Sequence, residues 1–239
     1  MNSSFTVILT ALLPAAILVF FIWFKDKNSP EPVKELLKAF FLGILSIPLS
    51  LAMSIPFAKI GLYNDDSVTA FGRLCESFFG AAIPEEVAKF VILWLILRRN
   101  KYFDEKMDGI VYSVCVSLGF AAVENILYLF SHVETYLSLG VMRGIFAVPG
   151  HFCDAVLMGY YYSLARFYPK CSTRNKVLVL LAPITVHGLY DAILLVMDLT
   201  PAISGLLSIV FLVFCFWMWK QASRSIRNHL KRDGYCPVK

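Results

Sequence analysis

Two adjacent glutamates and a lysine interrupt an otherwise apolar stretch, "GAAIPEEVAKFVILWLILRR", at residues 80–99. Glu85 lies four residues before Lys89 and Glu86 lies three residues before it, so on a helix the ammonium group can reach either carboxylate. Two carboxyl groups this close together in a low dielectric tend to share one proton, which provides one base and one acid. The pair could therefore activate a water molecule, although Lys89 could equally do no more than neutralise one of the two charges.

Three more apolar segments carry ionisable side chains. They are "GFAAVEN", with Phe120 and Glu124; "VPGHFCDA", with His151 and Asp154; and "TVHGLYDA", with His187 and Asp191. The i, i+4 spacing of His187 and Asp191 lets the carboxylate hold one ring nitrogen and set the tautomer. His151 and Asp154, at i, i+3, could do the same or could form a purely structural pair.

These residue types are suited to hydrolysis. A glutamate can take a proton from water while a histidine stabilises the developing oxyanion or protonates the leaving amine. The same side chains could instead hold a zinc ion with a water molecule in an open coordination position. The candidate zinc ligands are Glu86, Glu124, His151 and His187.

The composition predicts that these residues lie in a membrane. Of the 239 residues, 58% are hydrophobic and 16% are charged, and the mean hydropathy is +0.68; soluble domains carry about 25% charged residues. About 20 mostly apolar residues span the hydrocarbon, and the sequence contains seven such runs: residues 5–24, 36–57, 70–97, 109–131, 138–167, 177–197 and 202–219. We expect an all-α, polytopic membrane helix bundle, with residues 1–219 as one integral-membrane domain and residues 220–239 as a basic cytoplasmic tail.

The basic residues predict the orientation of this bundle. Most of the 22 lysines and arginines flank the first, third and fifth loops or lie in the tail, all on one side of the predicted map. By the positive-inside rule the amino terminus faces out and the carboxyl terminus faces the cytoplasm. This pattern accounts for the net charge of +5, so no nucleic-acid partner is needed. The first apolar run lacks a basic leading segment, so we expect a retained helix and not a cleaved signal peptide.

The ionisable residues are predicted to share one level of the membrane. An ionised side chain at the centre of a membrane helix costs roughly 2.5–3.5 kcal/mol, so several of them facing lipid would cost about 10 kcal/mol or more. That rivals the whole stability of a domain, about 5–15 kcal/mol. Glu85, His151 and His187 lie near the middle of their runs, and Glu124 is displaced by about four residues, or roughly 6 Å. We therefore expect four helices to contribute to one hydrated site.

Three short motifs carry a resemblance to a known family. "EEVAK", "FAAVE" and "HGLYD" resemble the EExxK, FxxxE and HxxxD motifs of the PrsW family, and they occur in the same order. The resemblance covers about residues 71–195. The HExxH, GxSG and GxGD motifs of other intramembrane proteases do not occur in the sequence. PrsW proteins are multi-spanning proteases of the bacterial cell membrane, distantly similar to type-II CAAX prenyl endopeptidases and bacteriocin-processing enzymes.

The resemblance implies roles for single residues. Glu85 and Glu86 would activate the water. Glu124 would support the site or bind a metal, and His187 with Asp191 would complete it. The supporting positions are Lys89 and Phe120 within the motifs and, by their depth, His151 and Asp154. CAAX-type relatives have a histidine where this chain has Glu124, so a zinc-dependent mechanism and a mechanism without metal both stay open.

The resemblance also implies a function. The expected activity is an intramembrane endopeptidase that makes a site-1-type cut in a single-span membrane protein, such as an anti-sigma factor, near its outer juxtamembrane part. A second hypothesis is a proton-coupled transporter or channel, because buried carboxylates and histidines also relay protons. The inverted repeats typical of many transporters are not evident. A third hypothesis is a scaffold without catalytic activity that binds membrane partners through the polar pocket.

Overall fold

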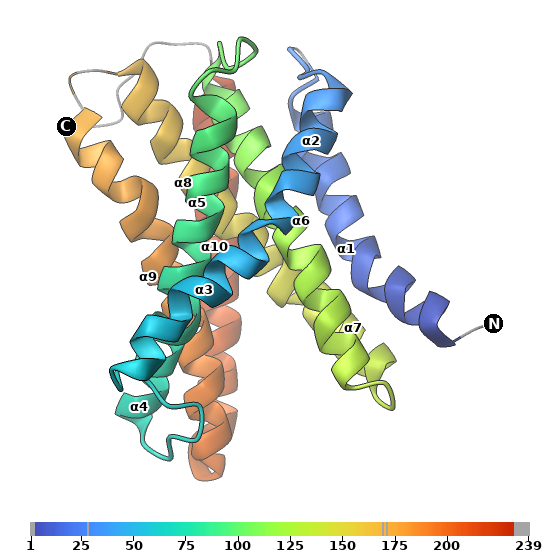
Figure 1. The fold of residues 1–239 in the computed structure, drawn as a ribbon, viewed down its shortest axis with the longest axis vertical. Coiled ribbons are helices and arrows are strands. Elements are labelled where there is room, and N and C mark those ends of the chain that lie inside the picture. Colours follow the sequence, from blue (N-terminus) through green and yellow to red (C-terminus); the bar gives the residue numbers. More distant parts are fainter. Residues whose placement is uncertain (1–2, 28, 169, 171, 232–239) are drawn as a thin grey trace.

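The protein is a bundle of helices (Figure 1). The computed structural model describes the chain apart from residues 1–2, 28, 169, 171 and 232–239, and no strand occurs in the part that it describes. This confirms the predicted all-α, polytopic class. The elements in chain order are α1 (Ser3–Lys25), α2 (Val33–Ile44), α3 (Ser46–Lys59), α4 (Ala70–Cys75), the π-helical η1 (Glu76–Ala82), α5 (Ile83–Leu97), α6 (Lys106–Ser131), α7 (Tyr136–Ile145), α8 (Ala147–Phe167), α9 (Ser172–Leu199), the 3-10 turn η3 (Pro201–Ile203) and α10 (Ser204–Leu230).

Six helical runs in the described residues are long and apolar enough to cross a membrane, where the sequence predicts seven. They contain α1, α2 with α3, α6, α7 with α8, α9, and α10 with the preceding turn. The seventh predicted run, residues 70–97, does form a continuous helical path through α4, η1 and α5. It carries the charged pair and packs against α3, α6 and α9. The run is divided into three shorter elements, so no single helix in it reaches spanning length. One face of α5, with Glu86 and Lys89, is buried against the other helices, and the opposite face is exposed at Trp94 and Leu95.

Two of the predicted spans are each broken into two helices. α2 ends at Ile44, whose carbonyl would normally bond to the N–H of residue 48, which is Pro48. α7 ends in the same way at Ile145, four residues before Pro149. A proline has no N–H to donate and its ring crowds the carbonyl four residues back, so each helix ends there and a new helix begins at once.

Helix α6 forms the centre of the bundle. Residues 107–122 of this helix are all buried, and its main neighbours are α8, α2 and α1. The contact with α2 is close enough to require glycine on both sides. A side chain at Gly119 would overlap the Phe40 carbonyl, and one at Gly43 would overlap the Val116 carbonyl. Small residues allow this close approach between membrane helices.

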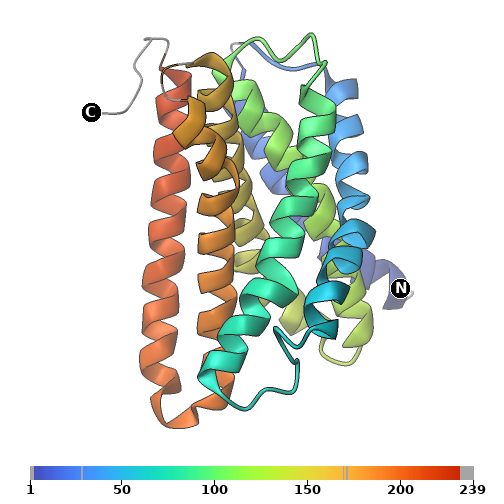
Figure 2. The same cartoon turned by 60° about the vertical axis from the view of Figure 1, so that its left-hand side comes forward.

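The loops with most of the basic residues lie at one end of the bundle, at the top of Figures 1 and 2. This arrangement agrees with the alternation from which the orientation is predicted; the side that faces the cytoplasm stays a prediction. α10 continues past residue 219 through the first part of the predicted tail, residues 220–239, and ends at Leu230. Its last turns pack against α8, where His229 Nε2 lies 3.2 Å from the Tyr160 carbonyl oxygen. Residues 232–239 of the predicted tail lie outside the described residues.

Candidate active site

A π-helical turn, η1, directly precedes the two glutamates. The Ile83 N–H donates to the carbonyl of Phe78, five residues back, whereas an α-helix uses the carbonyl four residues back. Pro84 follows and has no N–H to donate. The sequence predicts a kink at this proline, and the structure places a wide π turn there, a feature often found at functional sites. α5 then begins, with Glu85 and Glu86 in its first turn.

The two glutamates lie in different surroundings. The Glu86 side chain is fully buried, whereas the Glu85 side chain is 18% exposed and lines a cavity of about 370 Å³. Buried Lys89 donates from Nζ to Glu86 Oε1 at 2.8 Å and to Glu85 Oε2 at 3.2 Å. The ammonium group thus contacts both carboxylates, as the spacing predicts. Of the two glutamates, Glu85 is the one that can meet a molecule in the cavity.

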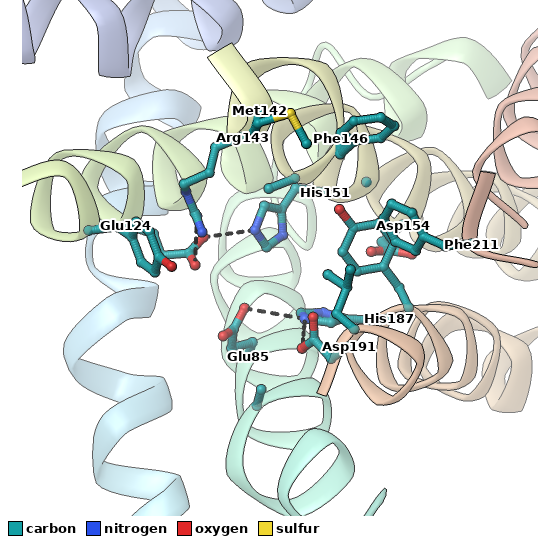
Figure 3. Close-up of a pocket in the computed structure, with 16 residues that line it drawn as sticks. Glu85, Glu124, Met142, Arg143, Phe146, His151, Asp154, His187, Asp191 and Phe211 are labelled. Atoms are coloured by element: carbon teal, nitrogen blue, oxygen red, sulfur yellow. Dashed lines mark hydrogen bonds and ion pairs between the residues drawn. The ribbon is translucent and has the colours of Figure 1, made fainter. Parts of the chain in front are cut away.

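His187 on α9 lies between carboxylates from two helices. Its Nδ1 is 2.8 Å from Glu86 Oε1, and its Nε2 is 3.2 Å from Asp191 Oδ2, the contact predicted from the i, i+4 spacing. The same Nε2 is 3.9 Å from Glu85 Oε2 (Figure 3). Because both ring nitrogens face carboxylate oxygens, a ring with a proton on each nitrogen satisfies both contacts. His187 is therefore placed to give a proton to a group in the cavity.

His151 on α8 has two partners, and neither is Asp154. Lys89 Nζ lies 3.2 Å from its Nδ1, and Glu124 Oε2 lies 2.8 Å from its Nε2. An ammonium group can only donate, so Nδ1 must accept and Nε2 must carry the proton that is donated to Glu124. Glu124 thus holds the tautomer of His151, the role that the sequence analysis considered for Asp154. Ser117, which no motif in the sequence marks, donates to the His151 carbonyl at 3.1 Å.

Arg143 on α7 fixes Glu124 from the other side. Its Nη2 is 2.9 Å from Glu124 Oε1, and its Nε donates to Asn125 Oδ1 at 2.6 Å. The guanidinium also lies over the Tyr128 ring, 4.4 Å from the centroid. Asn125 and Tyr128 were missed from the sequence, although both lie close to Glu124 along α6, at i+1 and i+4. Figure 3 shows the resulting chain of contacts from Arg143 through Glu124 to His151.

The cavity joins the predicted site residues from four helices. Those that line it are Glu85, Glu124, His151, Asp154, His187 and Asp191. Glu86, Lys89 and Phe120 lie behind this wall, and the Phe120 ring lies 4.2 Å from Lys89 Nζ in a cation–π contact. Asp154 is 2% exposed, and its Oδ1 has no hydrogen-bond partner among the described residues. Aromatic side chains also line the cavity, among them Phe146, Tyr190 and Phe211.

Four of these side chains form a cluster that could hold a metal ion. One donor atom from each of Glu85, Glu86, His151 and His187 lies within 4.8 Å of the others, which suits the donor types that zinc prefers. Glu124, a predicted ligand, is not in this cluster, and Glu85 is. The Lys89 ammonium contacts three of the four members at 2.8–3.2 Å. As the side chains lie, a cation already occupies the place between these donors, so zinc would fit only after Lys89 moves.

The sequence and its relatives identify a family. Residues 31–219 match a family described as PrsW family intramembrane metalloprotease. The chain is 33% identical to Protease PrsW of Clostridioides difficile (strain 630) over 230 residues, which cover 94% of this chain and 92% of that protein. It is 33% identical to Protease PrsW of Bacillus subtilis (strain 168) over 227 residues, 94% and 97% of the two chains. No solved structure matches the chain significantly.

Proposed function

The chain belongs to the PrsW family of intramembrane proteases and is thus a membrane-embedded peptidase, and from that membership we propose that it cleaves its substrate with a water molecule activated by Glu85. One observation carries the choice of base: Glu85 lines the cavity, whereas Glu86 is fully buried behind it. The resemblance alone assigns water activation to both glutamates. The difference in burial gives them separate roles.

Glu85 takes a proton from water as the water oxygen attacks the peptide carbonyl carbon. The carbonyl oxygen becomes an oxyanion, and the buried ammonium of Lys89, which contacts Glu85 at 3.2 Å, supplies a positive charge from behind the cavity wall. The C–N bond then breaks, and His187 gives the leaving nitrogen its proton. The proton on Glu85 returns to His187 across the 3.9 Å between Oε2 and Nε2, which restores both groups. The products are a carboxylic acid and an amine.

The remaining polar residues position these groups. Glu86 and Asp191 hold the two nitrogens of His187, at 2.8 Å and 3.2 Å. Glu124 holds His151, whose Nδ1 accepts from Lys89 and so helps to keep the ammonium group in place. If zinc is bound after Lys89 moves, Glu85, Glu86, His151 and His187 would hold it, and it would polarise the carbonyl or the water.

The proposed substrate is a single-span membrane protein of the anti-sigma factor class, cut near its outer juxtamembrane part. The substrate class comes from the family resemblance. The position of the cut is supported by Glu124, which lies toward the predicted outer end of α6, and by Arg143, which lies in the predicted outer half of the α7–α8 span; both line the cavity.

Reconstitution tests the proposal directly. The purified chain and a single-span anti-sigma factor are incorporated into liposomes, and cleavage is followed by gel electrophoresis. We expect the wild type to cut and Glu85→Gln to lose activity by about 100-fold or more, as removal of a general base does. Glu134→Gln, in the exposed α6–α7 loop, is the matched control and should cut normally. Intact substrate with folded wild type would contradict the proposal, and proton flux that Glu85→Gln abolishes, without cleavage, would support a transporter.

A further inference from the structure

A second polar cavity lies far from the catalytic residues, at the end of the bundle that carries most of the basic loops. Its volume is about 360 Å³, and it lies between α2 and the end of α5, which run side by side in Figure 2. We call it the α2–α5 groove. Its lining residues are Glu35, Lys38, Leu42, Leu95, Ile96, Arg99, Asn100, Lys101 and Tyr102.

The α2–α5 groove has more positive than negative charge. Lys38 pairs weakly with Glu35, at 3.6 Å, and its side chain is 60% exposed. Arg99 and Lys101 are exposed and have no ion-pair partner among the described residues. Lys101 Nζ lies 4.8 Å from the Tyr102 ring centroid, which directs it along the wall of the groove. Two cations on one short loop are thus available to an anion.

Both walls change from cationic to apolar toward the middle of the bundle. On α2, Leu42 follows Lys38 by four residues toward the middle of the bundle. On the opposite wall, Leu95 precedes Arg99 by four residues, also toward the middle. Four residues of helix measure roughly 6 Å, so both walls place a leucine about one turn below a cation. A phospholipid presents the same order, with a charged headgroup above an apolar chain.

We propose that the α2–α5 groove binds one anionic phospholipid of the leaflet that this end of the bundle faces. Arg99 and Lys101 contact the headgroup phosphate, and an acyl chain lies along Leu42 and Leu95. An arginine suits this role because its planar guanidinium can donate two hydrogen bonds to one phosphate. The site is independent of the proteolytic reaction.

A comparison of Arg99 with its neighbour Arg98 distinguishes a specific lipid site from general attraction to a charged membrane. Arg98 is also exposed, but its guanidinium lies over the Trp94 ring at 4.8 Å, outside the groove. The full-length protein is placed in detergent, and binding of phosphatidylglycerol and phosphatidylcholine is measured by native mass spectrometry. We expect phosphatidylglycerol to bind more tightly, and Arg99→Gln and Lys101→Gln each to weaken it about fivefold. Arg98→Gln should bind as the wild type does.

A change in the floor of the α2–α5 groove tests its shape without altering charge. Leu42→Trp fills the space below the cations, so it should also weaken phosphatidylglycerol binding while every basic residue is kept. Because Arg98, Arg99 and Lys101 are exposed, we expect their substitution to leave the fold intact. Thermal unfolding in detergent checks this for each variant. Equal loss in the Arg98 and Arg99 variants, or equal binding of the two lipids by the wild type, would overturn the proposal.

Discussion

The ammonium nitrogen of Lys89 lies 3.2 Å from Nδ1 of His151, although the two residues are 62 positions apart in the chain. This contact joins the charged turn of α5 to the beginning of α8. Through it, the Glu85–Glu86 pair on one side and Glu124 on the other form one continuous polar network. Lys89 is therefore the central cation of the site and does more than neutralise a single glutamate.

Glu86 is expected to matter for stability as well as for activity. Glu86→Gln removes one of the two carboxylates that neutralise buried Lys89, and breaking a buried ion pair costs about 3–5 kcal/mol. We expect a smaller loss here, about 2 kcal/mol, because Glu85 still contacts the ammonium group. Glu85→Gln should lose activity with a smaller effect on thermal unfolding in detergent. The double variant Glu86→Gln/Lys89→Met should regain part of the lost stability, and a further loss would contradict the pairing.

Metal content distinguishes the two mechanisms that the sequence leaves open. Because Lys89 occupies the place between the donors, we expect purified wild type to contain much less than one zinc per chain by elemental analysis. Dialysis against a chelator should leave cleavage unchanged. Stoichiometric zinc that disappears in His151→Ala, together with loss of activity on dialysis, would show instead that Lys89 gives way to the ion.

The contact between Glu124 and His151 should be needed for full proteolytic activity. Glu124→Ala removes the acceptor for the Nε2 proton of His151 and leaves Arg143 without its ion-pair partner. We expect cleavage to fall by about tenfold or more, as for loss of a residue that orients a histidine. Glu124→Gln keeps an acceptor oxygen and should be less impaired. Identical activities for the two variants would mean that Glu124 acts only through its charge.

Gly188, next to His187, sets the distance between α9 and η1. A Cβ at this position would lie 2.6 Å from the Phe78 ring, which is too close for any real contact. Gly188→Ala should push the two segments apart, destabilise the protein by about 1–3 kcal/mol, and reduce cleavage. Phe78→Leu in the same chain should restore part of both. Gly205→Ala, which meets nothing within 4 Å, is the matched control and should change neither.

The stability of the protein should depend on pH through Asp26, at the end of α1. Asp26 is 3% exposed, and its Oδ2 has no hydrogen-bond partner among the described residues. Burial, and after it the nearby Glu31 carboxyl, raises the pKa of Asp26 from 3.8 to about 7. A raised pKa means that its contribution to stability is present below the unfolded value and is lost as the pH rises through about 7.

Asp26→Asn removes this dependence. At pH 8 the variant should be more stable than the wild type, by on the order of 2 kcal/mol, and the difference should shrink as the pH falls toward 5. Thermal unfolding in detergent across this range measures the effect, and the exposed Asp66→Asn serves as the control. A difference that is constant with pH would show that Asp26 does not titrate in this range.

The helical membrane class and most span positions follow from hydropathy, because apolar runs of spanning length have few other stable forms. The breaks before Pro48 and Pro149 were not predicted, although both prolines stand in the sequence. A proline in a membrane helix can also be absorbed as a kink, since neighbouring groups can bond the freed carbonyl. Whether the helix kinks or ends depends on packing, which local sequence does not contain.

The sequence by itself determined the contacts within one helix. Lys89 reaches both glutamates, and His187 reaches Asp191, because residues three or four positions apart on a helix share a face. The same spacing made a contact between His151 and Asp154 possible, but His151 pairs with Glu124 of another helix instead. The tertiary structure alone decided the contacts between helices, such as Glu86 with His187, 101 positions away, and the rotation that turns Glu85 toward the cavity. These depend on how whole helices pack and on the π turn before α5, and no spacing along a single helix records that geometry.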